Sequence, residues 1–235
     1  MNSKTNREVI LITGSSKGIG KSICEHFLKS PEVVVIGCSR SPSTIKHKKY
    51  IHYQIDMSKK ESSNELIQHI KKDVNQLNAL INNVGTAAMN HLLLTTSEKV
   101  DQIINLNLKS VINLTREAVK LIKKEENGRI INMTTVAVPL SLEGEAVYVS
   151  SKAGIEAFTK TIAKELNSFG ITVNAIGPGP VKTDLIKNIS ENKIKKILSQ
   201  LSCNEFTRVS DIINVIDFLL KKESRLINGQ IIYLG

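Results

Sequence analysis

The stretch from Val9 to Gly20 constrains the fold of this chain more than any other segment. An apolar run typical of a buried strand leads directly into a turn that contains Gly14, Gly18 and Gly20. A helical pattern follows as far as Leu28. Glycine permits tight turns, and the N-terminus of a helix offers free N–H groups to a pyrophosphate. The order strand, glycines, helix predicts a dinucleotide-binding fold, with a simple strand-to-helix turn as the alternative.

Strand and helix patterns alternate along the rest of the chain, which indicates a parallel sheet between two layers of helices. We expect strands at 8–13, 32–38, 50–55, 78–82, 129–134, 171–176 and 230–234. We expect helices at 18–29, 61–74, 97–125, 147–168, 185–200 and 210–221. The predicted fold class is α/β, a Rossmann-type doubly wound, seven-stranded parallel sheet with helices on both faces. A chain of 235 residues suits a single domain over 1–235 with a sizeable core.

Ser39 and Arg40 end the second predicted strand and bear on the choice of dinucleotide. Folds that bind NAD often place an acidic residue about 20 residues beyond the glycines, where it binds the ribose hydroxyls. Arg40 stands at that place instead, and an arginine suits a 2′-phosphate through paired hydrogen bonds. Lys17 could add a second positive charge or be incidental, whereas Arg40 is one of only six arginines. NADP(H) is therefore the predicted cofactor.

Tyr148 and Lys152 form the second chemically informative feature. They are four positions apart at the head of a predicted helix, so they share one of its faces. A free tyrosine titrates near pH ~10, and a nearby positive charge lowers that pKa toward the range useful for general acid–base catalysis. Taken alone, the spacing is also compatible with two ordinary surface residues.

Further motifs follow in a recognisable order. They are Thr13-Gly14-x-x-x-Gly18-x-Gly20, Asp56 after the third strand, Asn82-Asn83-Val84-Gly85, Asn107, the Tyr148/Lys152 pair and the segment 173–179. With these motifs the chain resembles the short-chain dehydrogenase/reductase family from about Glu8 to the C-terminus. It is similar in particular to the subgroup that contains the 3-oxoacyl-carrier-protein reductases.

The resemblance implies roles for the matching residues. Tyr148 would give its proton to a carbonyl oxygen as hydride arrives from the nicotinamide. Lys152 would lower the tyrosine pKa and hold the nicotinamide ribose, and Asn107 would support a water chain that returns the proton. Asn83 and Gly85 would line the adenosine side. The expected cofactor-binding residues are Gly14, Ser15, Ser16, Lys17, Gly18, Ile19, Gly20, Ser39, Arg40, Asp56, Met57, Asn83, Val84, Gly85, Tyr148, Lys152, Pro178, Gly179, Val181 and Thr183.

Two positions depart from the family pattern. The family usually has a serine 13 residues before the tyrosine, and Thr135 occupies that position here. Its hydroxyl can still polarise a carbonyl, while the extra methyl restricts the rotamer. We expect Thr135 to keep the catalytic role, with slower turnover. Val84 replaces the more usual alanine and implies a modest change in packing.

The segment 184–207 is where we expect substrate selection. Ile186, Ile189, Ile194, Ile197, Leu198 and Leu201 recur at roughly helical spacing. This pattern predicts either a mobile lid with an apolar underside that excludes water, or a plain amphipathic helix packed on the domain.

Composition excludes several other classes of protein. The net charge is +10, yet the lysines are scattered in pairs and aromatic residues make up only 4%, so we expect no nucleic-acid partner. No apolar run approaches the ~20 residues of a membrane helix, and the N-terminus lacks the pattern of a signal peptide. The three cysteines and five histidines show no disulfide or metal-ligand spacing. We expect a cytoplasmic protein without a metal, most simply a homotetramer, with a dimer as the alternative.

The leading functional hypothesis is an NADPH-dependent carbonyl reductase, with a 3-oxoacyl thioester as substrate and an acyl carrier protein as a candidate partner. The alternatives are an alcohol dehydrogenase or reductase of another small or secondary-metabolite ketone, and a non-catalytic NADP(H)-binding sensor or scaffold. The presence of Tyr148, Lys152 and Asn107 favours an enzyme over a sensor.

Overall fold

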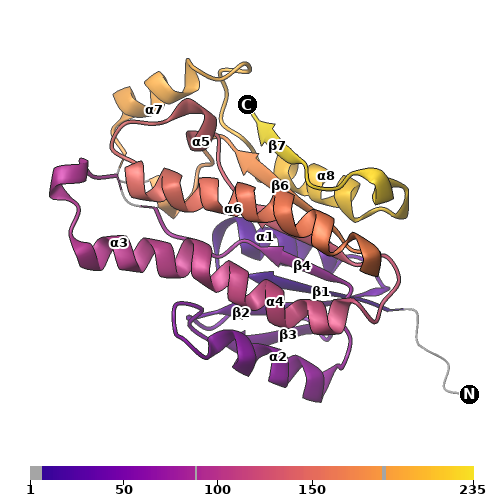
Figure 1. Cartoon of the computed structure of the whole chain (residues 1–235). Helices are drawn as coiled ribbons and strands as arrows, with labels where there is room; N and C mark the ends of the chain where they lie inside the picture. Colours follow the sequence, from indigo (N-terminus) through magenta and orange to yellow (C-terminus); the bar gives the residue numbers. More distant parts are fainter. Residues whose placement is uncertain (1–6, 88, 187–188) are drawn as a thin grey trace, which may run out of the picture.

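The computed structural model describes residues 7–87, 89–186 and 189–235. Within these ranges the strands form one seven-stranded parallel sheet in the order β3-β2-β1-β4-β5-β6-β7 (Figure 1). The strands are β1 (Glu8–Thr13), β2 (Val33–Ser39), β3 (Tyr50–Gln54), β4 (Ala79–Asn82), β5 (Arg129–Met133), β6 (Thr172–Pro178) and β7 (Ile231–Leu234). The sheet confirms the predicted fold class.

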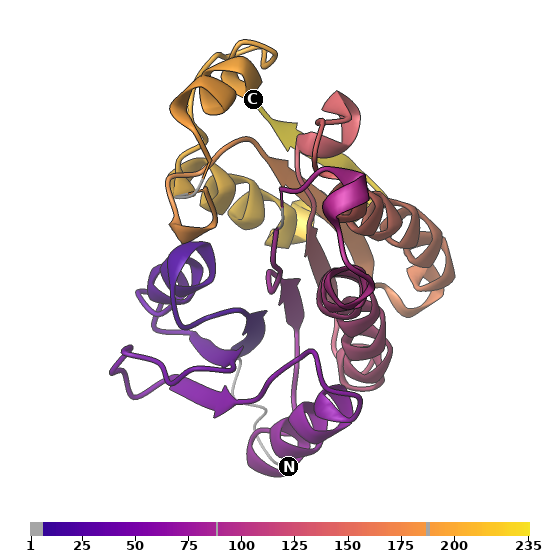
Figure 2. The same ribbon diagram turned by 90° about the vertical axis from the view of Figure 1, so that its left-hand side faces the viewer.

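Helices cover both faces of the sheet, as Figure 2 shows from the side. The helices are α1 (Gly18–Phe27), α2 (Ser62–Asp73), α3 (Ser97–Ile104), α4 (Ser110–Ile122), α5 (Ala137–Leu140), α6 (Ala146–Glu165), α7 (Glu191–Leu198) and α8 (Val209–Leu220). Helices α2, α4 and α6 pack on one face, and α1 and α8 pack on the other. In the described part of the chain, no helix is both long and apolar enough to cross a bilayer.

The alternation of side chains along each strand produces the two cores. Val9 and Leu11 of β1 pack with the α2, α4 and α6 layer, whereas Ile10 and Ile12 pack with the α1 and α8 layer. All four side chains are at most 2% exposed. Because both faces of the strand are buried, the strand reads as a continuous apolar run and not as an alternating one.

The helix expected at 97–125 is interrupted by a π-helical turn. The turn spans Asn105–Lys109 between α3 and α4, and Asn107 is buried within it. The run expected at 185–200 contains a 3₁₀ turn at Asp184–Ile186 and the short helix α7, while 187–188 lie outside the described residues. Helix α5 and the 3₁₀ turns at Leu92–Leu94, Asn167–Phe169 and Lys222–Leu226 were not predicted, because elements of three to five residues are too short to show a period.

The order of the strands determines where a ligand can bind. The chain builds outward from β1 to β3 and then continues from β4 to β7 on the other side of β1. The connections after β1 and β4 therefore diverge beyond the carboxyl ends of these strands. Ligands of open α/β sheets bind in such crevices.

Candidate active site

The glycine loop joins β1 to α1 and lies against the end of β4. Gly14 and Gly18 have φ angles of 71° and 57°, in the left-handed region that favours glycine. A Cβ on Gly20 would lie 2.3 Å from the Gly14 carbonyl oxygen, so no side chain fits there. The N-cap residue of α1, Lys17, makes no side-chain capping bond. The first N–H groups of α1 can therefore serve a phosphate, and the loop fits a dinucleotide pyrophosphate.

Asn83 holds this loop in place. Its Nδ2 donates to the Thr13 carbonyl oxygen at 2.9 Å and to that of Gly14 at 3.4 Å. The backbone N–H groups of Asn83 and Val84 both donate to the Thr13 hydroxyl, at 3.1 and 3.0 Å. The Asn83 side chain, expected to line the adenosine side, thus binds the glycine-loop backbone.

The ends of β2 and β3 form the side expected for adenosine. Ser39 Oγ donates to the Ser41 carbonyl oxygen at 2.7 Å, and Arg40 is exposed. Asp56 accepts hydrogen bonds from the N–H and hydroxyl of Ser58 at 3.0 and 2.8 Å. These bonds and the charge of Arg40 hold the Asp56 pKa below its usual range, so Arg40 lies near this carboxylate.

Three residues of the predicted cofactor set lie differently from expectation. The Met57 side chain is 3% exposed and belongs to the core, so only its backbone can face a ligand. Ser15 is buried, its Oγ accepts a bond from the Tyr50 hydroxyl at 3.3 Å, and its backbone N–H donates to the Cys38 carbonyl oxygen at 3.3 Å, so Ser15 supports the loop from within. The Lys17 ammonium lies 2.9 Å from Asp184 Oδ2, across to the segment after β6. Of the two basic residues considered for a 2′-phosphate, Lys17 thus contacts Asp184, whereas Arg40 is exposed at the end of β2.

Tyr148 and Lys152 lie in the first turns of α6 with their side chains buried. They are 9% and 6% exposed, and both line one cavity of about 170 Å³. Lys152 Nζ donates to the Met133 carbonyl oxygen at 2.8 Å, at the end of β5. Burial excludes the interpretation of the pair as two ordinary surface residues.

Burial dominates the electrostatics of this pair. Burial first and the Glu145 carboxylate second raise the pKa of Tyr148 to about 12, while a hydrogen bond with Thr135 opposes the rise. Burial lowers the pKa of Lys152 to about 8. The net shift of the tyrosine pKa is therefore upward and not the expected lowering, because desolvation disfavours the charged form of both groups.

Thr135 follows β5 and lines the same cavity. Its hydroxyl accepts a hydrogen bond from the Ala137 backbone N–H at 3.2 Å, at the start of α5. The structure therefore brings the threonine hydroxyl and the Tyr148 phenol together, as the spacing of 13 residues implied. A carbonyl oxygen in the cavity would have both hydroxyl groups available to it.

The π-helical turn directs Asn107 toward α6. Asn107 Nδ2 donates to the Thr86 carbonyl oxygen at 2.8 Å and to Ser151 Oγ at 3.1 Å, and Oδ1 accepts from the Thr86 N–H at 2.8 Å. Ser151 Oγ in turn donates to the Tyr148 carbonyl oxygen at 2.7 Å. Asn107 thus ties the loop after β4 to the first turn of α6. Such π turns often occur at functional sites.

Gly85 lies on a different side of the site from the one expected. A Cβ there would be 3.3 Å from Asn107 Oδ1 and 3.5 Å from Lys152 Nζ. Gly85 is thus next to the Tyr148/Lys152 pair and not on the adenosine side. Any larger residue would crowd Asn107.

The remaining walls of the cavity come from two directions. Pro178, Gly179, Val181 and Thr183, which were expected to bind the cofactor, line it from the end of β6 and the segment that follows. Ile186, Ile189, Ile194 and Ile197 line it from the predicted lid. The helical spacing of these isoleucines was therefore a sign of an apolar cavity wall, while movement of the lid stays a prediction.

Glu145 is a residue of the cavity wall that was not predicted from the sequence. It precedes α6, is 8% exposed, and lines the cavity three residues before Tyr148. Burial raises its pKa, and the charge of Lys193 on α7 opposes that rise. Its proximity to Tyr148 was the only available signal, and nothing in the sequence showed that this glutamate would be buried.

The sequence of the chain is similar to those of known proteins. Residues 8–194 match the family model described as short chain dehydrogenase. The chain is 31% identical over 234 residues to a 3-oxoacyl-[acyl-carrier-protein] reductase FabG of Staphylococcus epidermidis, which covers 96% of each protein.

Two solved structures share the fold. One is a 4-hydroxyisoleucine dehydrogenase complexed with NADH, with a TM-score of 0.90, 24% identity and 97% coverage of both chains. The other is the aldohexose dehydrogenase of Thermoplasma acidophilum in ligand-free form, with a TM-score of 0.87 and 23% identity, covering 99% of this chain and 94% of that one.

Proposed function

The chain belongs to the short-chain dehydrogenase family, and on that premise we propose that it is an NADPH-dependent reductase of 3-oxoacyl thioesters. The family makes it an oxidoreductase of CH–OH and C=O groups that uses a nicotinamide cofactor. The observation that carries the proposal is the buried Tyr148/Lys152 pair in an apolar cavity beside the glycine loop.

The chain's own residues supply the acid catalysis. The glycine loop, Arg40 and Lys152 would hold the dinucleotide, which when bound supplies the hydride. Tyr148 donates its phenolic proton to the carbonyl oxygen, so that hydride and proton together yield the alcohol. Thr135 hydrogen-bonds the same oxygen as charge develops on it. The Lys152 ammonium, held on the Met133 carbonyl oxygen, stabilises the phenolate that remains.

Two observations support a 3-oxoacyl substrate. The Staphylococcus epidermidis relative, matched over 96% of both proteins, carries that activity in its name. The isoleucines of the segment 186–197 offer an apolar surface for an acyl chain. The cavity of about 170 Å³ also suits a small ketone, which is the second candidate.

Arg40 supports NADP(H) over NAD(H). It is exposed at the end of β2 with no acidic residue in its place, and a guanidinium is suited to a 2′-phosphate. Asp56 is near enough to Arg40 for their charges to interact, which would help to orient the guanidinium.

We further propose that the protein forms a homotetramer and that an acyl carrier protein presents the substrate. Phe218 on α8 and Tyr233 on β7 are 44% and 38% exposed, which supports subunit contacts at this edge of the sheet. Light scattering after size-exclusion chromatography would show four subunits of 26.0 kDa if the assembly is a tetramer.

The function is tested by NADPH oxidation with acetoacetyl thioesters, simple ketones and quinones. We expect the thioesters to give the highest kcat/KM, and Tyr148→Phe to remove the activity because the proton donor is lost. A higher kcat/KM for simple ketones would favour the second candidate. Binding of NADPH without turnover of any compound would refute the enzyme assignment.

A further inference from the structure

Glu145 is a buried carboxylate that the reduction mechanism does not use. It is 8% exposed and lines the cavity together with Tyr148 and Thr135. Among the residues that the structure describes, no group hydrogen-bonds its carboxylate. Buried charges normally have hydrogen-bonding partners, because leaving them without any costs several kcal/mol. Among the described residues, the solvent-inaccessible side-chain atoms without a hydrogen bond are Asn82 Oδ1 and Arg129 Nε, so the oxygens of Glu145 are reached from the cavity. A ligand that fills the cavity and excludes solvent must therefore bring a donor for this carboxylate.

Glu145 has no evident role in holding the fold. It occupies the N-cap position of α6, but its side chain makes no capping hydrogen bond. Its backbone provides the local contacts, with N–H donating to Leu142 O at 3.2 Å and the carbonyl accepting from Val149 N–H at 2.7 Å. A change of the side chain therefore leaves the start of α6 intact.

The charges around Glu145 limit which ligand group it can accept. Lys193 of α7 approaches from the lid, with Nζ 3.3 Å from the place where a Cβ of Gly144 would stand. From α6, Tyr148 and Lys152 line the same cavity, and Lys193 is the ammonium whose charge acts on the Glu145 carboxylate. Lys193 thus already balances the negative charge of Glu145. A cationic ligand would meet the like charges of Lys193 and Lys152 in this cavity, whereas a neutral N–H or O–H donor would not.

We propose that Glu145 is a specificity-determining residue that selects oxo substrates carrying a neutral hydrogen-bond donor on one of the two arms of the reacting carbonyl. The inference rests on the proposed function and narrows its substrate class. Two kinds of substrate have such a donor, namely thioesters whose thiol arm contains an amide N–H and ketones that carry a nearby hydroxyl. Among the described residues that line the cavity, Glu145 is the one carboxylate, and the neighbouring Leu142 and Ala137 are apolar.

Matched substrate pairs test the proposal. The first pair is acetoacetyl-N-acetylcysteamine and its analogue with CH₂ in place of the amide N–H. The second is 4-hydroxy-2-butanone and 2-pentanone. A hydrogen bond to a charged group contributes roughly 1.5–3 kcal/mol, so we expect at least one pair to show about a tenfold to hundredfold preference in kcat/KM for the donor.

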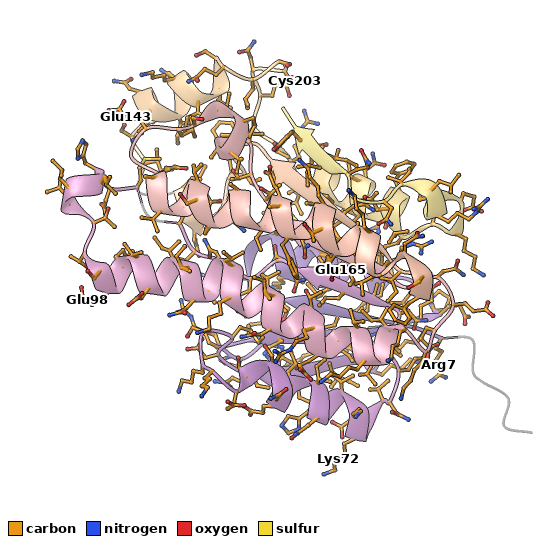
Figure 3. The ribbon with its side chains drawn as sticks, in the orientation of Figure 1. Arg7, Lys72, Glu98, Glu143, Glu165 and Cys203 are labelled. Carbon is orange, nitrogen blue, oxygen red and sulfur yellow. The ribbon has the colours of Figure 1, made fainter. Side chains whose placement is uncertain are left out.

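Variants of Glu145 and of two neighbouring residues distinguish recognition of the substrate's donor from other effects of a substitution. Glu145→Leu should abolish the preference, because it removes the hydrogen bond made by the donor substrate, whereas its effect through the Tyr148 pKa changes kcat/KM equally for both members of a pair. Glu145→Gln should retain part of the preference through the amide oxygen. The matched control is Glu143→Gln, because Glu143 is exposed on the outside of the same loop (Figure 3). Lys193→Gln should leave the preference in place if Glu145 acts on the substrate and does not merely pair with the lid.

Three results would overturn the proposal: no donor preference in either pair, equal effects of Glu145→Leu on both members, or the same loss of preference in Lys193→Gln. Which pair shows the preference distinguishes an amide from a hydroxyl. Binding of the corresponding alcohols to the NADP⁺ complex, measured by thermal shift, separates this proposal from the proposed function. If no compound is turned over, the function fails, and the difference in shift between paired alcohols still decides the role of Glu145.

Discussion

Replacing Lys152 with methionine should stabilise the protein while removing its activity. The side chain is 6% exposed, and burial lowers its pKa from 10.5 to about 8. At about 1.4 kcal/mol for each tenfold change in protonation, burying this ammonium at neutral pH costs roughly 3 kcal/mol. Methionine has a similar length and carries no charge, so Lys152→Met removes that cost.

One interaction is lost in return. Lys152 Nζ donates to the Met133 carbonyl oxygen at 2.8 Å, and removal of the donor costs about 1 kcal/mol. The net gain is about 2 kcal/mol. For a chain of this size, each kcal/mol raises Tm by about 2–4 °C, so Lys152→Met should melt about 4–8 °C higher at pH 7.

The dependence on pH identifies the cause. Between pH 8 and 10.5 the native Lys152 has lost its proton while the unfolded chain still holds one, so the stability of the wild type rises with pH in this window. The advantage of Lys152→Met is therefore complete below pH 8 and shrinks toward pH 10.5. Calorimetry at pH 7 and pH 10 measures both values, with Lys160→Met, exposed on the same helix, as the control. A variant that is less stable than the wild type at pH 7, or a gain independent of pH, would refute the reasoning.

Three further predictions concern cofactor selection, the hydroxyl of Thr135 and the glycine loop. Arg40→Ala should lower kcat/KM with NADPH about tenfold to hundredfold and leave that with NADH nearly unchanged, because a charge-assisted contact to a phosphate is lost; an equal loss with both cofactors would contradict this role. Thr135→Val should lower kcat by at least tenfold, because the hydroxyl that polarises the carbonyl is lost; Thr135→Ser should keep or raise kcat, because it retains the hydroxyl and removes the methyl group, and initial-rate kinetics measures both. Gly20→Ala should destabilise the protein by at least 2 kcal/mol in urea titrations, because its Cβ would lie 2.3 Å from Gly14 O; an unchanged midpoint would show that the loop yields easily.

The fold was predictable because the apolar pattern of the single segments and the alternation of strands and helices along the chain indicate the same α/β sheet. The strands are buried on both faces, so they read as apolar runs, and their order follows from the alternation with helices. The π-helical turn at Asn105–Lys109 was not predictable, because one extra residue in a turn leaves the apolar period of a long helix nearly unchanged. The same limit applies to α5, whose four residues make barely one turn.

The sequence predicted which residues form the site better than it predicted their burial and pKa values. Glycine spacing and the positions of Tyr148 and Lys152 indicated which residues would meet. Sequence spacing does not report solvent access, however, and solvent access sets the pKa of Tyr148 and leaves Glu145 without a hydrogen bond. The contact of Lys17 with Asp184 joins residues 167 positions apart and depends on the loop after β6, which no local pattern specifies.

The shifted pKa values change the way in which the catalytic pair works. With the Tyr148 pKa at about 12 and that of Lys152 at about 8, the pair at pH 7 holds both protons, which is the form that reduction consumes. Reduction should therefore be independent of pH below 8 and decline above it as Lys152 loses its proton. Alcohol oxidation needs the form with one proton fewer, so its rate should rise tenfold per pH unit up to about 8 and then level off. Burial thus biases the site toward reduction at neutral pH, and pH–rate profiles in both directions would show one shared apparent pKa near 8. A shared value near 6 would mean that Lys152 lowers the tyrosine pKa after all.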